Sequence, residues 1–228
     1  MMNSGTKPSK IETMEKYLES TYYIDWRTAN ILSLARELSE TCQDSLQFAR
    51  VCFQFVRDNI QHSLDYALNP VTCKASDVLE HGTGYCYAKS HLLAALLRAQ
   101  GIPTGLCYQR LTIAHNTPPF CLHGLNALYL KEFGWYRVDA RGNKAGVNTS
   151  FCPPVEQLAF PIRTEGEADI PGIWAEPLPE VISVLENSTN YQAVAENLPD
   201  LEIVGEKFPP SYIYDDSFKR SNACLTRP

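Results

Sequence analysis

The sequence predicts an α+β fold in which N-terminal helices and a central helix pack on an antiparallel sheet. Three observations support this prediction. Apolar residues recur at helical spacing in the first third of the chain, a long apolar helix follows, and three strand-like segments come after it. A chain of 228 residues is long enough for one domain with elaborations.

The first third of the chain is predicted to form helices that cover a core. Residues 28–40 and 41–59 each place apolar side chains on one face, at Ile31, Leu34, Ala35, Leu38, Leu46, Ala49, Val51, Phe53 and Val56. Asn69-Pro70 then marks a turn. Ser76 or Asp77 is the expected N-cap of a short helix that ends at Gly82.

The central helix is predicted over Cys86–Gln100. Its apolar residues lie on several sides, which indicates a largely buried helix. Gly101 and Pro103 end it. Three predicted strands follow, at 104–111, 122–130 and 135–140. The last two flank a short turn and form an antiparallel hairpin, while residues 112–120 are expected to connect the first two and to wall a cleft.

The composition changes after Arg141. Ten of the fifteen prolines lie from Pro153 onward, so residues 142–228 are expected to form a mostly irregular wrap on a core of residues 1–141. A separate substrate domain is the less favoured alternative for this segment. Short helices are predicted at 180–186 and 191–196. The expected aromatic anchors of the wrap are Phe160, Trp174 and Tyr212.

The composition also limits the class of protein. Hydrophobic residues make up 44% and charged residues 20% of the chain, as in globular proteins. The net charge of -6 and the absence of a Lys/Arg block argue against nucleic acid as a partner. The longest apolar run, Leu92–Leu97, is too short to span a membrane, and residues 1–10 contain no apolar signal core. We therefore expect a cytoplasmic protein.

Most of the eight cysteines are expected to be free thiols, because their density is low and no export signal is visible. Seven are interpreted as small buried hydrophobic residues: Cys42, Cys52, Cys73, Cys107, Cys121, Cys152 and Cys224. Cys86 differs because it follows the Gly82-Thr83-Gly84 corner and opens a helix. The helix N-terminus stabilises a thiolate, and its backbone N–H groups, that of Cys86 included, can hold an oxyanion.

The nucleophile needs a histidine as base and acid. His91 lies five residues along the same helix and points about 140° away. His62, His81 and His115 lie in predicted loops or turns, where a solvated or capping histidine is the usual interpretation. His123 instead begins a strand, which can hold an imidazole in a fixed geometry.

Asp139 is the predicted partner that orients His123. A five-residue loop from Leu130 to Gly134 pairs Leu125 with Asp139, and His123 then lies on the neighbouring diagonal. Cys86, His123 and Asp139 are therefore the candidate catalytic triad. Cys86 is expected to be an exposed nucleophile, and Tyr85 and Tyr87 beside it are candidates for lining the substrate cleft.

Three sequence blocks resemble the bacterial transglutaminase-like superfamily, from about Val56 to Asn143. They are the segment 82–103, which begins Gly-Thr-Gly-Tyr-Cys-Tyr-Ala-Lys, then His123-Gly124, and then Val138-Asp139-Ala140. The resemblance implies a papain-like, transglutaminase-core fold in which a nucleophile helix packs on the sheet that carries the histidine and the aspartate.

Two departures limit what the resemblance implies. Calcium-dependent animal transglutaminases have glutamine before and tryptophan after the nucleophile, whereas Tyr85 and Tyr87 flank Cys86 here. No acidic cluster resembles their calcium sites, so neither a metal nor another cofactor is implied. The nearest upstream glutamine, Gln61, is remote in sequence, and the second oxyanion donor stays unassigned.

The expected function is acyl transfer from an amide or peptide bond through an acyl-enzyme on Cys86. Hydrolysis by a protease, amidase or deamidase is favoured over transamidation of protein glutamine, and a non-catalytic interaction module on the same fold is a further alternative. A zinc site built on Cys121 and His123 with His81 or His115 is opposed by the absence of a CxxC pair. The expected partner is a protein, peptide or small amide substrate, and the oligomeric state is left open.

Overall fold

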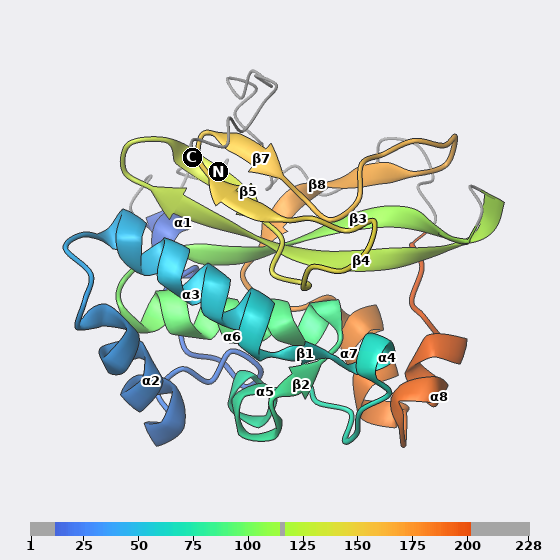
Figure 1. Cartoon of the computed structure of the whole chain (residues 1–228), viewed down its shortest axis with the longest axis horizontal. Helices are drawn as coiled ribbons and strands as arrows, with labels where there is room; N and C mark the ends of the chain where they lie inside the picture. Colours follow the sequence, from blue (N-terminus) through green and yellow to red (C-terminus); the bar gives the residue numbers. More distant parts are fainter. Residues whose placement is uncertain (1–11, 115–116, 202–228) are drawn as a thin grey trace, which may run out of the picture.

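A helical layer packs on one face of a four-stranded antiparallel sheet (Figure 1). The computed structural model of the protein describes residues 12–114 and 117–201. The helices are α1 (Glu12–Glu15), α2 (Ala29–Ser39), α3 (Ser45–Asn59), α4 (Ser63–Tyr66), α5 (Ala75–His81), α6 (Cys86–Ala99), α7 (Pro179–Asn187) and α8 (Tyr191–Glu196). The strands are β1 (Gln61–His62), β2 (Thr83–Gly84), β3 (Thr104–Ala114), β4 (Thr117–Leu130), β5 (Gly134–Val138), β6 (Ser150–Cys152), β7 (Val155–Gln157) and β8 (Ala168–Trp174).

The main sheet has the strand order β5-β4-β3-β8, and all three pairings are antiparallel. The predicted α+β class with an antiparallel sheet is confirmed. The predicted hairpin of β4 and β5 is also confirmed, with Leu130 paired to Gly134. Residues 112–120 were expected to be a connection, and that expectation is wrong for most of them. β3 and β4 extend into this segment and pair there as a long hairpin.

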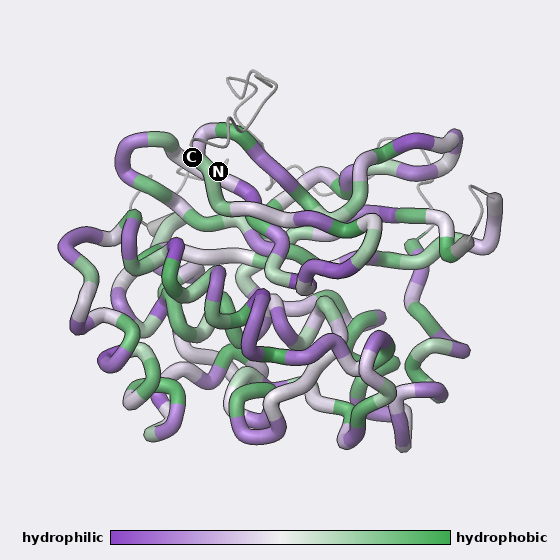
Figure 2. Tube along the Cα trace, in the orientation of Figure 1, coloured by the Kyte–Doolittle hydropathy of each residue, from purple (hydrophilic) through white to green (hydrophobic). Residues whose placement is uncertain are grey.

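Helix α6 is the centre of the molecule. It lies between the sheet and the other helices of the layer (Figure 1), and every residue from Cys86 to Arg98 is buried. Its buried position confirms the prediction made from apolar residues on several sides of the helix. Hydrophilic residues gather instead on loops and on the outer turns of the helices (Figure 2).

The short helix α5 begins earlier than predicted, with Lys74 as its N-cap. Ser76 is not the cap because its backbone N–H and its hydroxyl both bind the carboxylate of Asp25, at 3.0 Å and 2.5 Å. Gly82 ends the helix as predicted, with a left-handed φ of 63° that favours glycine. These two ends fix the position of the corner that precedes Cys86.

The segment after Arg141 contributes to the main sheet. β8 pairs with the edge of β3, while β6 and β7 form a separate antiparallel hairpin. The sequence predicts α7 and α8 but none of these three strands. Of the expected anchors, Trp174 stacks edge-to-face on Tyr108 at 5.5 Å between ring centroids. Tyr212 lies outside the described residues.

Arg98 joins three separate segments near the end of α6. Its guanidinium donates to the backbone carbonyls of Thr104 at 2.9 Å, Glu19 at 2.9 Å and Ala175 at 2.7 Å. Burial lowers the pKa of Arg98 to about 10, so the side chain remains charged at neutral pH. One buried side chain therefore satisfies carbonyls from both ends of the described chain.

Arg98→Met is expected to reduce the free energy of unfolding by about 3 kcal/mol, because one buried and two partly buried hydrogen bonds to carbonyls lose their charged donor. Chemical denaturation measures this loss. The matched control is Arg36→Met on the exposed face of α2, which should change stability by less than about 0.5 kcal/mol. Equal effects of the two substitutions would contradict the structural role of Arg98.

Candidate active site

Cys86 is the first residue of α6, and a short parallel pair of strands holds the chain just before it. β1 pairs with β2, with His62 opposite Gly84. The N-cap residue, Tyr85, makes no side-chain cap, so it leaves the N–H groups of the first turn for another acceptor. The side chain of Cys86 is buried, with 7% exposed, which corrects the expectation of an exposed nucleophile.

Gly124 on β4 lies directly against the start of α6. Its backbone N–H is 3.5 Å from the sulfur of Cys86. A Cβ at this position would lie 2.9 Å from Cδ1 and 3.1 Å from Cα of Tyr87. Only a glycine allows β4 to approach the helix this closely, so Gly124 sets the distance between the helix that carries Cys86 and the strand that carries His123.

Gly124→Ala is therefore expected to move the start of α6 away from β4 and to lower kcat/KM by about ten-fold or more. The free energy of unfolding should fall by roughly 1–3 kcal/mol through overpacking. Gly134→Ala is the control. Gly134 has a φ of 76° and open space around it, so alanine there strains the backbone without reaching the site. Unchanged kcat/KM in Gly124→Ala would show that the close approach is not needed.

His123 and Asp139 come together as their strand register predicted. Asn126 pairs with Val138 at the end of β5, which carries the register on to Leu125 and Asp139. Nε2 of His123 lies 2.7 Å from Oδ2 of Asp139. Because Nε2 faces the carboxylate, Nδ1 is the ring nitrogen left for the sulfur of Cys86.

The carboxylate of Asp139 is fully buried and held by backbone donors as well as by His123. Oδ1 accepts the N–H of Arg141 at 3.1 Å, and Oδ2 accepts the N–H of Ala159 at 2.9 Å. The next residue, Phe160, packs edge-to-face on the His123 ring at 5.1 Å. The segment after Arg141 therefore helps to build the site, a role that the sequence did not predict.

The electrostatics of the site favour an imidazolium between two acceptors. Burial lowers the pKa of His123, but the charges of Asp139 and Cys86 and hydrogen bonds to both raise it to about 10. Burial raises the pKa of Asp139, but His123 and the N–H groups of Ala159 and Arg141 together hold it below its ordinary value. At neutral pH the arrangement can hold a proton on His123 beside the nucleophile.

The other described histidines lie elsewhere. His91 is fully buried, with Nδ1 2.7 Å from the carbonyl oxygen of Cys73, and burial lowers its pKa to about 4. His81 is exposed at the end of α5. His62 is not solvated, because β1 buries it against the ring of Tyr85, at 5.3 Å between ring centroids. It occupies the N-cap position of α4, although its side chain makes no capping hydrogen bond. His115 lies outside the described residues.

Tyr85 and Tyr87 are both buried, at 3% and 1% exposed. The hydroxyl of Tyr85 donates to the carbonyl of Tyr191, and that of Tyr87 donates to the carbonyl of Leu122. Burial raises the pKa of both hydroxyls. This placement differs from the expected lining of the cleft, since both rings anchor the start of α6 to its neighbours.

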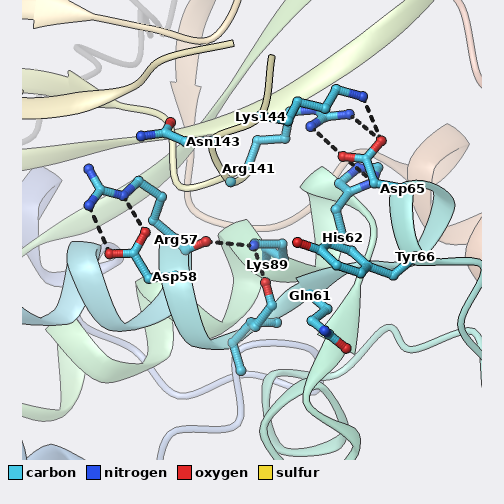
Figure 3. A pocket seen from close by; sticks show the side chains of 12 residues that line it. Arg57, Asp58, Gln61, His62, Asp65, Tyr66, Lys89, Arg141, Asn143 and Lys144 are labelled. Atoms are coloured by element: carbon cyan, nitrogen blue, oxygen red, sulfur yellow. Dashed lines mark hydrogen bonds and ion pairs between the residues drawn. The ribbon is translucent and has the colours of Figure 1, made fainter.

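A cavity of about 340 Å³ lies beside the triad, and sequence analysis did not identify it (Figure 3). The buried ammonium of Lys89 lies between its walls and donates to the carbonyls of Ile60 and Arg57 at the C-terminal end of α3. A lysine in a helix that is predicted to be largely buried was the sequence signal for this cavity. Gln61 also lines this cavity, so the strand pairing places it close in space to the nucleophile helix.

One wall of the cavity is an ion-paired cluster around Asp65. Its carboxylate binds the guanidinium of Arg141 at 2.7 and 3.1 Å and the ammonium of Lys144 at 2.6 Å. Despite partial burial, these bonds lower the pKa of Asp65 to about 2. The opposite wall carries Arg57 paired with Asp58 at 2.7 Å (Figure 3).

Within residues 12–114 and 117–201, no three His, Cys, Asp or Glu side chains gather in a way that could hold a metal ion. All seven cysteines in this part of the chain are free: Cys42, Cys52, Cys73, Cys86, Cys107, Cys121 and Cys152. Cys224 lies outside the described residues. No helix in the described ranges has the length and apolarity needed to cross a membrane.

The fold and the site define an α+β domain in which a helix-borne cysteine meets a strand-borne histidine and a buried aspartate. Residues 32–140, just under half of the chain, match the family model of the transglutaminase-like superfamily. The resemblance to the transglutaminase-like superfamily that was noted in the sequence is therefore confirmed for this region of the chain.

Solved structures with a similar arrangement come from several sources. A proposed cysteine protease from Cytophaga hutchinsonii is 20% identical, with a TM-score of 0.46, over 57% of this chain and 42% of that one. The periplasmic domain of TgpA from Pseudomonas aeruginosa is 19% identical, with a TM-score of 0.44, over 58% and 48%. Red sea bream transglutaminase is 12% identical, with a TM-score of 0.44, over 59% and 32%. The chain thus spans less than half of each of these proteins. No curated protein sequence matches it significantly.

Proposed function

We propose that the protein is a cysteine hydrolase that cleaves an amide or peptide bond through an acyl-enzyme on Cys86. One observation carries the proposal. The imidazole of His123 is bonded to the buried carboxylate of Asp139 at 2.7 Å, and its other nitrogen is left for Cys86. This is the arrangement that a thiol nucleophile needs for activation and for proton transfer to a leaving group.

The proposed reaction has two steps. The thiolate of Cys86 attacks the carbonyl carbon, the C–S bond forms, the C–N bond breaks, and His123 gives its proton to the leaving amine. Water then attacks the thioester, His123 takes a proton from it, and the C–S bond breaks to release the acid. In both steps the N–H groups at the start of α6 stabilise the oxyanion.

Hydrolysis is proposed over transamidation because water needs no second binding site for an amine substrate. Product analysis with and without added glycine ethyl ester distinguishes the two outcomes. Release of the free acid at an unchanged rate supports a hydrolase. A dominant amide product with the added amine would instead assign the transamidation that the same acyl-enzyme permits.

The nucleophile is tested by brief labelling with iodoacetamide at pH 7, followed by peptide mapping. Exposure alone predicts that Cys42, Cys121 and Cys152, which are only partly buried, react before Cys86. We expect the reverse, because the helix N-terminus and the imidazolium of His123 favour a thiolate at Cys86. Burial raises the pKa of Cys121 to about 12, which keeps that thiol protonated. Labelling that follows exposure would count against an activated nucleophile.

A further inference from the structure

The cavity beside the triad shares its walls with the elements that carry the triad. Lys89 follows Cys86 by three residues, so both lie on the same face of α6, one turn apart. Arg141 follows Asp139 by two residues and donates its N–H to that carboxylate. The cavity is therefore lined by the helix that carries the nucleophile and by the segment that follows Asp139.

The cavity is lined by more basic than acidic side chains, in a protein whose net charge is -6. Four basic side chains, Arg57, Lys89, Arg141 and Lys144, line it together with only two carboxylates, Asp58 and Asp65. The ammonium of Lys89 is bonded to backbone carbonyls and not to a carboxylate. Burial lowers the pKa of Lys89 to about 7, so an anion in the cavity would also favour its charged form.

Lys144 is the basic group best placed to meet a ligand. Its side chain is 45% exposed and makes a bond of 2.6 Å to Asp65. An ammonium has three N–H donors, so two remain after that bond. Arg141 is nearly buried, and its guanidinium is already paired with Asp65 at two nitrogens. The ion pair of Arg141 and Asp65 thus forms one wall of the cavity, and the ammonium of Lys144 is bound to that wall through Asp65.

We propose that this cavity is a subsite for a carboxylate of the substrate, so that the protein acts on amides or peptides that carry a carboxylate close to the scissile bond. The inference rests on the proposed function of Cys86. Peptides and amino-acid amides carry such groups at their C-termini and on acidic side chains. The positive surplus attracts them, and Lys144 supplies the donors.

Binding is measured by calorimetry on the Cys86→Ala protein, so that no turnover interferes. The probes are N-acetylglycine and its uncharged analogue N-acetylglycinamide, which differ only in the carboxylate. We expect N-acetylglycine to bind at least about ten-fold more tightly, and Lys144→Gln to weaken its binding roughly five-fold, the size of one partly exposed charge pair. Lys131→Gln, at an exposed turn between β4 and β5, is the matched control and should have no effect.

Two results would overturn the subsite. One is equal binding of the two probes. The other is inorganic phosphate binding as tightly as N-acetylglycine, which would assign a general anion site. An unchanged affinity in Lys144→Gln would overturn the role given to that lysine.

Measurements of turnover test the carboxylate subsite separately from the proposed hydrolase activity. Matched peptide substrates with a free C-terminal carboxylate or a carboxamide are compared, and we expect kcat/KM to favour the free acid about ten-fold, with the preference reduced in Lys144→Gln. Cleavage of both substrates at equal rates would support the hydrolase and refute the subsite. Absence of cleavage, together with Lys144-dependent binding of N-acetylglycine, would support the subsite and refute the hydrolase.

Discussion

Cys86→Ala is expected to abolish amide cleavage, with kcat/KM reduced by more than about a thousand-fold. The substitution removes the only protein atom that forms a bond to the acyl group in the proposed reaction. The melting temperature should stay within a few degrees of wild type, since alanine at a helix start is favourable and the side chain lost is small. A panel of peptidyl aminomethylcoumarin amides, with circular dichroism on the same samples, measures both quantities.

His123→Ala should lower kcat/KM to a similar extent, because the acceptor and donor of the proton is lost. The double variant should be little worse than either single one, since residues that act as a unit are strongly non-additive. His81→Ala, an exposed histidine at the end of α5, is the control and should leave kcat/KM unchanged. Activity that survives in Cys86→Ala would refute the assignment of the nucleophile.

Local sequence patterns were sufficient to predict the longer helices and the central hairpin, but not the short helices α1 and α4 and not all strands. β8 was missed because Pro171 and Gly172 interrupt its pattern. The strand tolerates a proline because β8 is an edge of the sheet, where a missing N–H costs no ladder bond. Pro118 and Pro119 in β4 were also interpreted as loop residues. They lie beyond the reach of β5, which pairs with β4 only from Asn126 onward, so β4 is an edge there too.

The part of the candidate site that depends on short-range sequence patterns could be predicted. A glycine corner before a helix identified Cys86, and strand register brought His123 and Asp139 together. The N–H of Ala159 at Asp139 could not be predicted, because that contact depends on how a proline-rich segment returns to the core. The ion pair of Asp65 and Arg141 could not be predicted either, because the two residues are 76 positions apart in the chain. The cytoplasmic location and the absence of nucleic-acid partners stay predictions.

Asp139→Asn is expected to have the second large effect, a change in the pH dependence of kcat/KM as well as a lower rate. The charge and hydrogen bonds of Asp139 help to raise the pKa of His123 to about 10. An amide supplies no charge, so the pKa of His123 should fall and the imidazolium should be lost at lower pH. The alkaline limb of the pH profile of kcat/KM should therefore move to lower pH, and the rate at neutral pH should drop by about a hundred-fold.

Asp139→Ala should be worse than Asp139→Asn for a reason that the structure makes specific. Asparagine keeps one oxygen that can accept a hydrogen bond from the imidazole or from the N–H of Ala159. Alanine leaves the imidazole of His123 without a partner to orient it. It also leaves two buried N–H groups, those of Ala159 and Arg141, without an acceptor. Each orphaned N–H costs about 1–3 kcal/mol, so the free energy of unfolding should fall for alanine more than for asparagine. Rates and stabilities of both variants across pH separate orientation from charge. A wild-type alkaline limb in Asp139→Asn would show that another group sets the pKa of His123, and a wild-type rate in Asp139→Ala would show that another residue orients it.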